Sequence, residues 1–248
     1  MQAMICKLCL QEKALIKKSH IIPDFMYNGL FDPIKHYVNY KNLSNGRARS
    51  LFDGIYDKHI LCQDCDSNVI GKNEDYVSKV LYGGNIGKEK RPMYFNQVNQ
   101  NGLKSTLISN IDYTKTKLFF LSLLWRAHIS KHEFFEQVDL GKEHSEEIRR
   151  MLLNNDSKEE TTYEASMIYA KPNDPRLIDT IIRPLKFANN NEVEFVFYIN
   201  GLFFHFNISS THNHKIFEVA KIKKDNTMRI FVLEHEVASE FVSRILIR

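Results

Sequence analysis

Two identical cysteine pairs constrain this chain more than any other feature of its sequence. Cys6 and Cys9 form one C-x-x-C unit, and Cys62 and Cys65, the remaining cysteines, form a second. Each unit delivers two sulfur ligands from one tight turn, and four thiolates are a common ligand set for tetrahedral zinc. We therefore expect one structural Zn²⁺ bound by all four cysteines. A redox-active dithiol and simple burial of four small side chains are the alternatives.

The overall composition is that of a folded protein. The 248 residues are 43% hydrophobic and 26% charged, which excludes global disorder. No apolar run approaches the roughly 18 residues of a membrane span. Lys7 and two cysteines occupy the segment where a secretion signal would need an apolar core. We expect a cytoplasmic protein with reduced thiols and no membrane partner.

The formal net charge of +4 lies entirely in residues 1–91, where 14 Lys or Arg residues stand against 10 Asp or Glu residues. Such a weak excess permits a phosphate-rich partner without requiring one. Between the cysteine pairs, residues 15–22 and 55–61 are apolar and β-branched, and they read as two strands. After Cys65 we expect two short helices, 66–70 and 73–82, separated at Gly71 and with Asn73 as the second N-cap.

We expect the chain to divide into an N-terminal module, residues 1–91, and an α+β domain, residues 92–248, with residues 83–102 as a linker or surface excursion. Lys117–Ile129 is almost continuously apolar and predicts a buried helix, in which Trp125-Arg126 favours a core position with a buried ion pair. Ser145–Leu153 predicts an amphipathic helix, and Val237–Ile247 a helix or a last strand. Six strands of an antiparallel sheet are predicted at Tyr163–Ala170, Ile178–Phe187, Val193–Ile199, Leu202–Ser209, Lys215–Ile222 and Met228–Leu233.

Asn200-Gly201 predicts a tight hairpin turn between two of these strands. Alternation places Phe204 on one face of the hairpin and Phe203 on the other, so both faces carry aromatic side chains. Either the 117–129 helix covers the second face, or that face is the interface of a homodimer or of a protein partner.

The first third of the chain resembles the HNH nucleases of the ββα-metal, or His-Me finger, group. The resemblance rests on the cysteine frame, on a strand ending in His20-Ile21-Ile22-Pro23, and on a second strand running into Leu61-Cys62-x-x-Cys65. It covers roughly residues 5–82. It implies a zinc-stabilised, treble-clef-like ββα module, a catalytic divalent ion held on the helix side, and hydrolysis of phosphodiester bonds.

Carried over residue by residue, His20 matches the general-base histidine of this family. Histidine suits the task because its ordinary pKa near 6.5 lets it take a proton from water at neutral pH. Asp57 stands where the family has a bracing asparagine. Asp66 replaces a metal-binding histidine and supplies an oxygen ligand, which suits Mg²⁺ or Mn²⁺. Ser19 replaces the usual acidic residue before the catalytic histidine.

Other carboxylates are candidates for completing the catalytic metal site. Asp66 ranks first, followed by Glu74, Asp24 and Asp57, and an unbroken helix would separate Asp66 from Glu74 by about 12 Å. Four basic residues are candidates for contacts with a nucleic-acid backbone: Lys17, Lys18, Arg47 and Arg49.

The sequence thus predicts a metal-dependent HNH-type endonuclease that acts on nucleic acid, double-stranded DNA rather than RNA. The resemblance also suggests a role in bacterial antiviral defence or in a mobile element. Residues 92–248 would choose the substrate, sense a ligand, or mediate assembly. A non-catalytic treble-clef zinc module that binds nucleic acid or a protein is the alternative, and the departures at Ser19 and Asp66 favour it.

Overall fold

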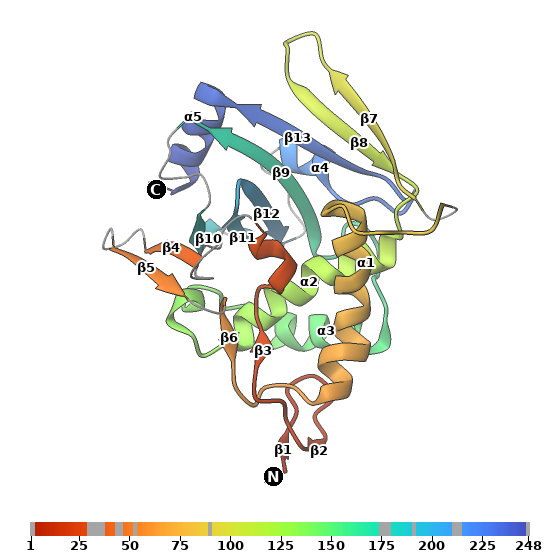
Figure 1. Cartoon of the computed structure of the whole chain (residues 1–248), viewed down its shortest axis with the longest axis vertical. Helices are drawn as coiled ribbons and strands as arrows, with labels where there is room; N and C mark the ends of the chain where they lie inside the picture. Colours follow the sequence, from red (N-terminus) through yellow and green to blue (C-terminus); the bar gives the residue numbers. More distant parts are fainter. Residues whose placement is uncertain are drawn as a thin grey trace.

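A mixed β-sheet with helices on both faces dominates the fold (Figure 1). The computed structural model describes residues 3–28, 38–42, 47–51, 54–88, 91–173, 180–189, 192–209 and 215–246. Within them, nine strands lie in the spatial order β5 (Arg47–Leu51), β4 (Val38–Asn42), β10 (Ile181–Asn189), β11 (Glu192–Ile199), β12 (Leu202–Asn207), β9 (Glu164–Pro172), β13 (Met228–Glu234), β8 (Lys104–Ser109) and β7 (Met93–Val98). The expected α+β class is confirmed.

Two pairings in this sheet are parallel, β4 with β10 and β9 with β13. The expected purely antiparallel sheet is therefore wrong. One parallel pair arises because β4 and β5 enter the sheet from the first third of the chain. The hydrophobic core is also continuous from Cys6 to Met228. The division of the chain at residue 91 stays a prediction.

The cysteine-bearing region contains only short strands. β1 (Met4–Ile5) and β2 (Glu12–Lys13) pair as one hairpin, and β3 (Ser19–His20) pairs antiparallel with β6 (Tyr56–Asp57). A π-helical segment, η2 (Cys65–Ile70), then runs directly into α1 (Gly71–Leu81). Gly71 has φ −60° and ψ −29°, which is helical backbone. The expected break there, and the cap at Asn73, are therefore wrong.

Helices cover both faces of the sheet. α2 (Tyr113–Ile129), the buried helix expected from the sequence, packs on one face, where the Phe120 and Phe204 rings lie 5.3 Å apart. The amphipathic helix is α3 (Gly141–Asn154), which packs beside α2. On the opposite face, Phe203 is fully buried and its ring lies 5.2 Å from Phe241 in α5 (His235–Leu246). The second face is thus covered, by α5 and α4 (Lys215–Ala220) rather than by α2.

Two further expectations require correction. The strand predicted at 215–222 is instead the helix α4, in which Phe217 and Ala220 are buried on one side, a three-residue spacing that a helix can face to the core. The predicted linker contains β7, and the hairpin of β7 and β8 extends from the body in Figure 1.

The Asn200-Gly201 turn is confirmed: both residues have positive φ, 49° and 80°, as a two-residue hairpin turn requires. Four strands lie close to their predicted positions, β9, β11, β12 and β13, and α5 resolves the last segment as a helix.

Candidate functional site

The four cysteine sulfurs come together in one cluster. Their Sγ atoms all lie within 4.8 Å of one another, and no disulfide joins them. The first pair sits on the β1–β2 hairpin, where Leu10 takes a left-handed φ of 59° that closes the turn. In the second pair, Cys65 is the first residue of η2 and Cys62 lies three residues before it. Four thiolates around one zinc ion at about 2.3 Å would lie roughly 3.8 Å apart, so this cluster is close enough to hold a metal ion.

The backbone ties the two cysteine turns together. The Cys62 amide donates to Cys6 Sγ at 3.3 Å, and the Lys7 amide donates to the Ile60 carbonyl at 2.9 Å. Burial acts to raise the pKa of the Cys6 thiol, but hydrogen bonds from the surrounding backbone outweigh it and lower that pKa to about 7. Burial raises the pKa of Cys65. One thiol thus ionises readily, and a bound cation would be needed to hold all four as thiolates.

His20 is the last residue of β3. Its Nε2 is 3.1 Å from Asp24 Oδ1, and its side chain is 24% exposed. The ring meets Tyr56, its partner across the β3–β6 pair, edge-on at 6.2 Å. The His20 ring thus lies between the Asp24 carboxylate and the Tyr56 ring and stays partly accessible to solvent.

Ser19 connects the strand of His20 to the start of the helix. Its hydroxyl is fully buried and donates to Asp66 Oδ1 at 2.7 Å. The Asp66 amide in turn donates to the Cys62 carbonyl at 3.0 Å. The serine that departs from the family pattern therefore positions the other departure, Asp66, beside the histidine strand.

Arg126 of α2 joins the histidine strand to α1. Its guanidinium donates to the main-chain oxygen of His20 at 2.7 Å and pairs with Glu74 Oε1 at 2.6 Å. The arginine is 2% exposed and Glu74 is 23% exposed. The buried ion pair expected at Arg126 is confirmed. Its contact with His20, 106 residues earlier in the chain, is the part of the site that sequence reasoning missed.

The remaining predicted residues lie around this centre. Asp57 Oδ2 accepts from the Lys131 amide at 2.9 Å, so it braces the turn after α2. Lys17 and Lys18 are exposed, and Lys18 Nζ lies 4.7 Å above the Tyr56 ring. Arg47 and Arg49 belong to β5, where the structure describes the backbone but not the side chains.

The structure does not assemble a second metal centre from the described residues. In that part of the chain, the cysteine cluster is where three or more His, Cys, Asp or Glu side chains converge closely enough to hold a metal ion. Because α1 continues η2 without a break, Asp66 and Glu74 lie about two turns apart on one helix axis. The roles of Asp66, Glu74 and Asp24 as ligands of a catalytic ion therefore stay predictions.

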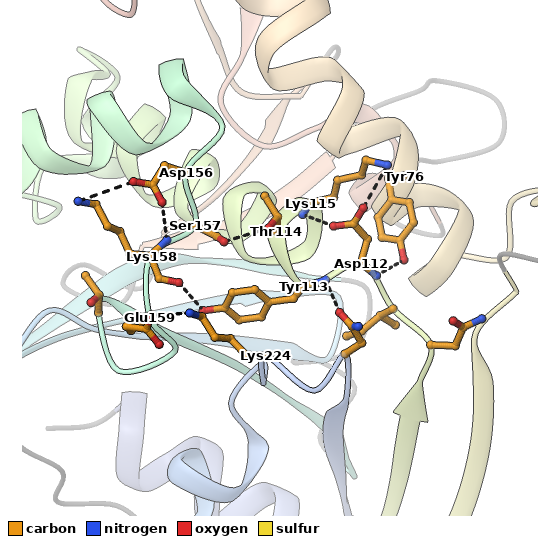
Figure 2. Close-up of a pocket in the computed structure, with 14 residues that line it drawn as sticks. Tyr76, Asp112, Tyr113, Thr114, Lys115, Asp156, Ser157, Lys158, Glu159 and Lys224 are labelled. Carbon is orange, nitrogen blue, oxygen red and sulfur yellow. Dashed lines mark hydrogen bonds and ion pairs between the residues drawn. The ribbon is translucent and has the colours of Figure 1, made fainter.

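A polar cleft of about 970 Å³ lies at the other end of α2 (Figure 2). Asp112, which caps α2, lines it, and by helix rise it is about 21 Å from Arg126. Three lysines at the cleft are paired with carboxylates: Lys115 with Asp112 at 3.2 Å, Lys158 with Asp156 at 3.7 Å and Lys224 with Glu159 at 2.5 Å. The charges cancel locally, and the cleft is separate from His20.

Comparison with known proteins found no matching family model, no matching curated protein and no matching solved structure. Among the described residues, no helix has the length and apolar character needed to cross a membrane.

Proposed function

We propose that this chain is a metal-dependent endonuclease of the HNH type, with a structural zinc ion in the cysteine cluster. One observation carries the proposal. The buried Ser19 hydroxyl, bonded to Asp66 at 2.7 Å, connects the strand that presents His20 to the helix that follows the second cysteine pair. The order of two paired strands and a helix, pinned by four cysteines, supports a ββα-metal module.

In this proposal His20 is the general base. It takes a proton from the attacking water, and Asp24 at 3.1 Å stabilises the imidazolium that results. Arg126 fixes the main chain of His20 from the far side of the strand, so the ring is held by both its backbone and its side chain. The 24% exposure of the His20 side chain leaves it within reach of a phosphodiester substrate.

We assign the catalytic Mg²⁺ or Mn²⁺ first to Asp66, whose Oδ1 accepts from Ser19 and whose carboxylate would supply an oxygen ligand. Such an ion would stabilise charge on the phosphate and on the leaving oxygen. We assign contacts with the nucleic-acid backbone to Lys17 and Lys18, which are exposed just before β3, and we propose double-stranded DNA as the substrate.

The ion pair of Glu74 with Arg126 favours a second candidate function. A carboxylate neutralised by a buried arginine is a weak metal ligand, which leaves the catalytic ion with fewer protein oxygens. The alternative is a treble-clef zinc module that binds nucleic acid or a protein without cutting it.

Two matched histidine variants separate these functions. His20→Asn should reduce Mg²⁺- or Mn²⁺-dependent plasmid cleavage by about 10²-fold or more, because the general base is removed. His59→Asn is the control: His59 is exposed in the same region and has a left-handed φ of 58°, which asparagine tolerates. Cleavage, zinc content and melting temperature are measured for both variants.

Equal cleavage by parent and His20→Asn protein, with equal zinc content, would reject His20 as the base. Absence of cleavage by the parent on duplex and single-stranded DNA and RNA, combined with retained nucleic-acid binding, would support the binding module instead.

A further inference from the structure

Strand β7 leaves an open edge on the large sheet. It is the last strand in the spatial order and pairs with β8 along its whole length, Met93 opposite Ser109 and Val98 opposite Lys104. Every residue of β7 is exposed. The tip of the β7–β8 hairpin projects beyond the rest of the molecule in Figure 1.

The exposed edge is unusually apolar. Large hydrophobic side chains that are exposed in the described part of the chain concentrate here: Met93 is 54% exposed, Tyr94 53%, Phe95 47% and Val98 65%. The segment from Met93 to Leu103 contains no charged residue. Native edge strands are usually protected by lysine, by an internal proline or by a bulge, and β7 has none of these.

The register shows which main-chain groups point outward. The Asn99 amide donates to the Leu103 carbonyl at 3.0 Å, so residue 99 bonds across the hairpin. Because alternate residues of an antiparallel pair bond to the same neighbour, residues 93, 95 and 97 also face β8. The amides and carbonyls of Tyr94, Asn96 and Val98 therefore point away from the sheet.

We propose that two copies of this chain associate through β7, antiparallel and about a two-fold axis at Asn96. In this register Asn96 lies opposite Asn96 of the partner subunit, and Tyr94 lies opposite Val98 of the partner subunit. The outward groups then form about six main-chain hydrogen bonds. The side-chain pairs match as well, because aromatic and β-branched residues are favourable cross-strand neighbours. Tyr94 is already anchored, since its hydroxyl donates to the Val80 carbonyl at 2.6 Å.

Two features favour a second copy of this chain as the partner of β7: the segment is uncharged, and a symmetric β7–β7 pair leaves no β7 edge open. Self-pairing places each residue against the same segment, and an uncharged strand meets no like-charge repulsion in doing so. The other edge strand of the described sheet is β5. Pairing β7 with β5 would leave one edge open on each copy and form fibres, whereas pairing β7 with β7 closes at a dimer.

Sedimentation velocity on the full chain tests this proposal. A six-residue strand pair is a small interface, so we expect a dimer whose fraction rises between about 5 and 300 µM. Asn96→Pro removes an outward amide at the two-fold axis and spares the main-chain bonds to β8, although Thr106 loses its side-chain bond to Asn96 Oδ1, and it should weaken association about tenfold or more. Val98→Lys places a charge on the edge and should do the same.

Val237→Lys is the matched control, because Val237 is 58% exposed on α5 and away from β7, and it should associate like the parent. Hydrogen exchange provides a second readout: the amides of residues 94, 96 and 98 should slow as the concentration rises. A monomer at 300 µM overturns the proposal, as does a dimer that survives both β7 substitutions with its melting temperature unchanged. The proposal is independent of the nuclease assignment.

Discussion

The cysteine region and the centre of the sheet differ in how much strand pairing holds their backbones. The strand that presents His20 and its partner are two residues long each, and the segment is fixed by two cysteine turns and by single long-range hydrogen bonds. β11 and β12 pair over six residues, and their aromatic side chains are buried on both faces. Both regions contribute buried side chains to one continuous core, and in the cysteine region, where ladder bonds are few, the four cysteines add a possible metal site.

The two regions meet at Arg126. It belongs to α2, which packs on the sheet, and it bonds to the main chain of His20 in the cysteine region. α2, which packs on the sheet, thus connects the sheet to the cysteine region. The variants below test that division, from the largest expected effect to the smallest.

Loss of one cysteine should affect the cysteine region most. Cys62→Ser removes a ligand, and structural zinc sites contribute on the order of 10 kcal/mol of binding free energy to folding. We expect loss of bound zinc and loss of exchange protection for residues 3–28 and 54–70, while β11 and β12 stay protected. Metal analysis and hydrogen exchange measure both effects, and prolonged treatment of the parent with a chelator should reproduce them.

Purified parent protein without zinc, and with four thiols that react freely with a maleimide, would contradict this prediction. Loss of protection spread evenly over the sheet and the cysteine region would contradict the division between them.

A cavity beside the sheet should lower the unfolding free energy while leaving the cysteine cluster unchanged. Phe203→Ala removes a fully buried ring that packs against Tyr198 at 4.8 Å and Phe241 at 5.2 Å. Large-to-small changes of this kind cost about 3–5 kcal/mol of unfolding free energy. Denaturant unfolding should show that loss, whereas zinc content per folded molecule should not change. A smaller zinc content would mean that the two regions are coupled more tightly than their contacts indicate.

Features with a local signal were predictable from the sequence. The C-x-x-C spacing predicted the convergence of four sulfurs, the apolar run predicted α2, and Asn200-Gly201 predicted the hairpin turn. Each depends on residues that are neighbours in the chain or on a ligand set with a fixed spacing. Periodicity failed for α4, where a six-residue segment is too short to distinguish strand from helix.

Features that depend on distant residues were not predictable. The bond between Arg126 and His20 joins residues 106 apart, and the bond between Ser19 and Asp66 joins residues 47 apart. Neither residue type nor spacing reports such contacts. The helix continues through Gly71, since η2 ends at Ile70 and α1 begins at the next residue. A single glycine costs a helix only about 1 kcal/mol, so it does not force a break.

The contact between the two regions gives the third prediction. Arg126→Met removes the ion pair and leaves Glu74 without its cation, which should cost about 3 kcal/mol. Adding Glu74→Gln should recover part of that loss, since a neutral amide tolerates the site better. A double-mutant cycle on unfolding free energy measures the coupling. Additive effects, with no recovery in the double variant, would show that the pair contributes little.

The smallest expected effect is a pH dependence of the unfolding free energy that arises from Lys117 in α2. Lys117 of α2 is 1% exposed, and its Nζ bonds to the Tyr113 hydroxyl at 3.1 Å. Burial lowers the pKa of Lys117 from its ordinary value of 10.5 to about 8. Between those two values the unfolded chain holds more protons than the folded chain, so the unfolding free energy should rise with pH in that window.

Lys117→Met removes this titration, so the parent should gain stability relative to the variant by about 2 kcal/mol as the pH rises from 8 to 10. Denaturant unfolding at half-unit pH steps measures the difference, and the comparison with the variant cancels the other titrating groups that both proteins share. A difference that stays constant across the window would mean that Lys117 is charged and well solvated in the folded state, and that α2 is less rigidly packed at this end than the burial of its side chains indicates.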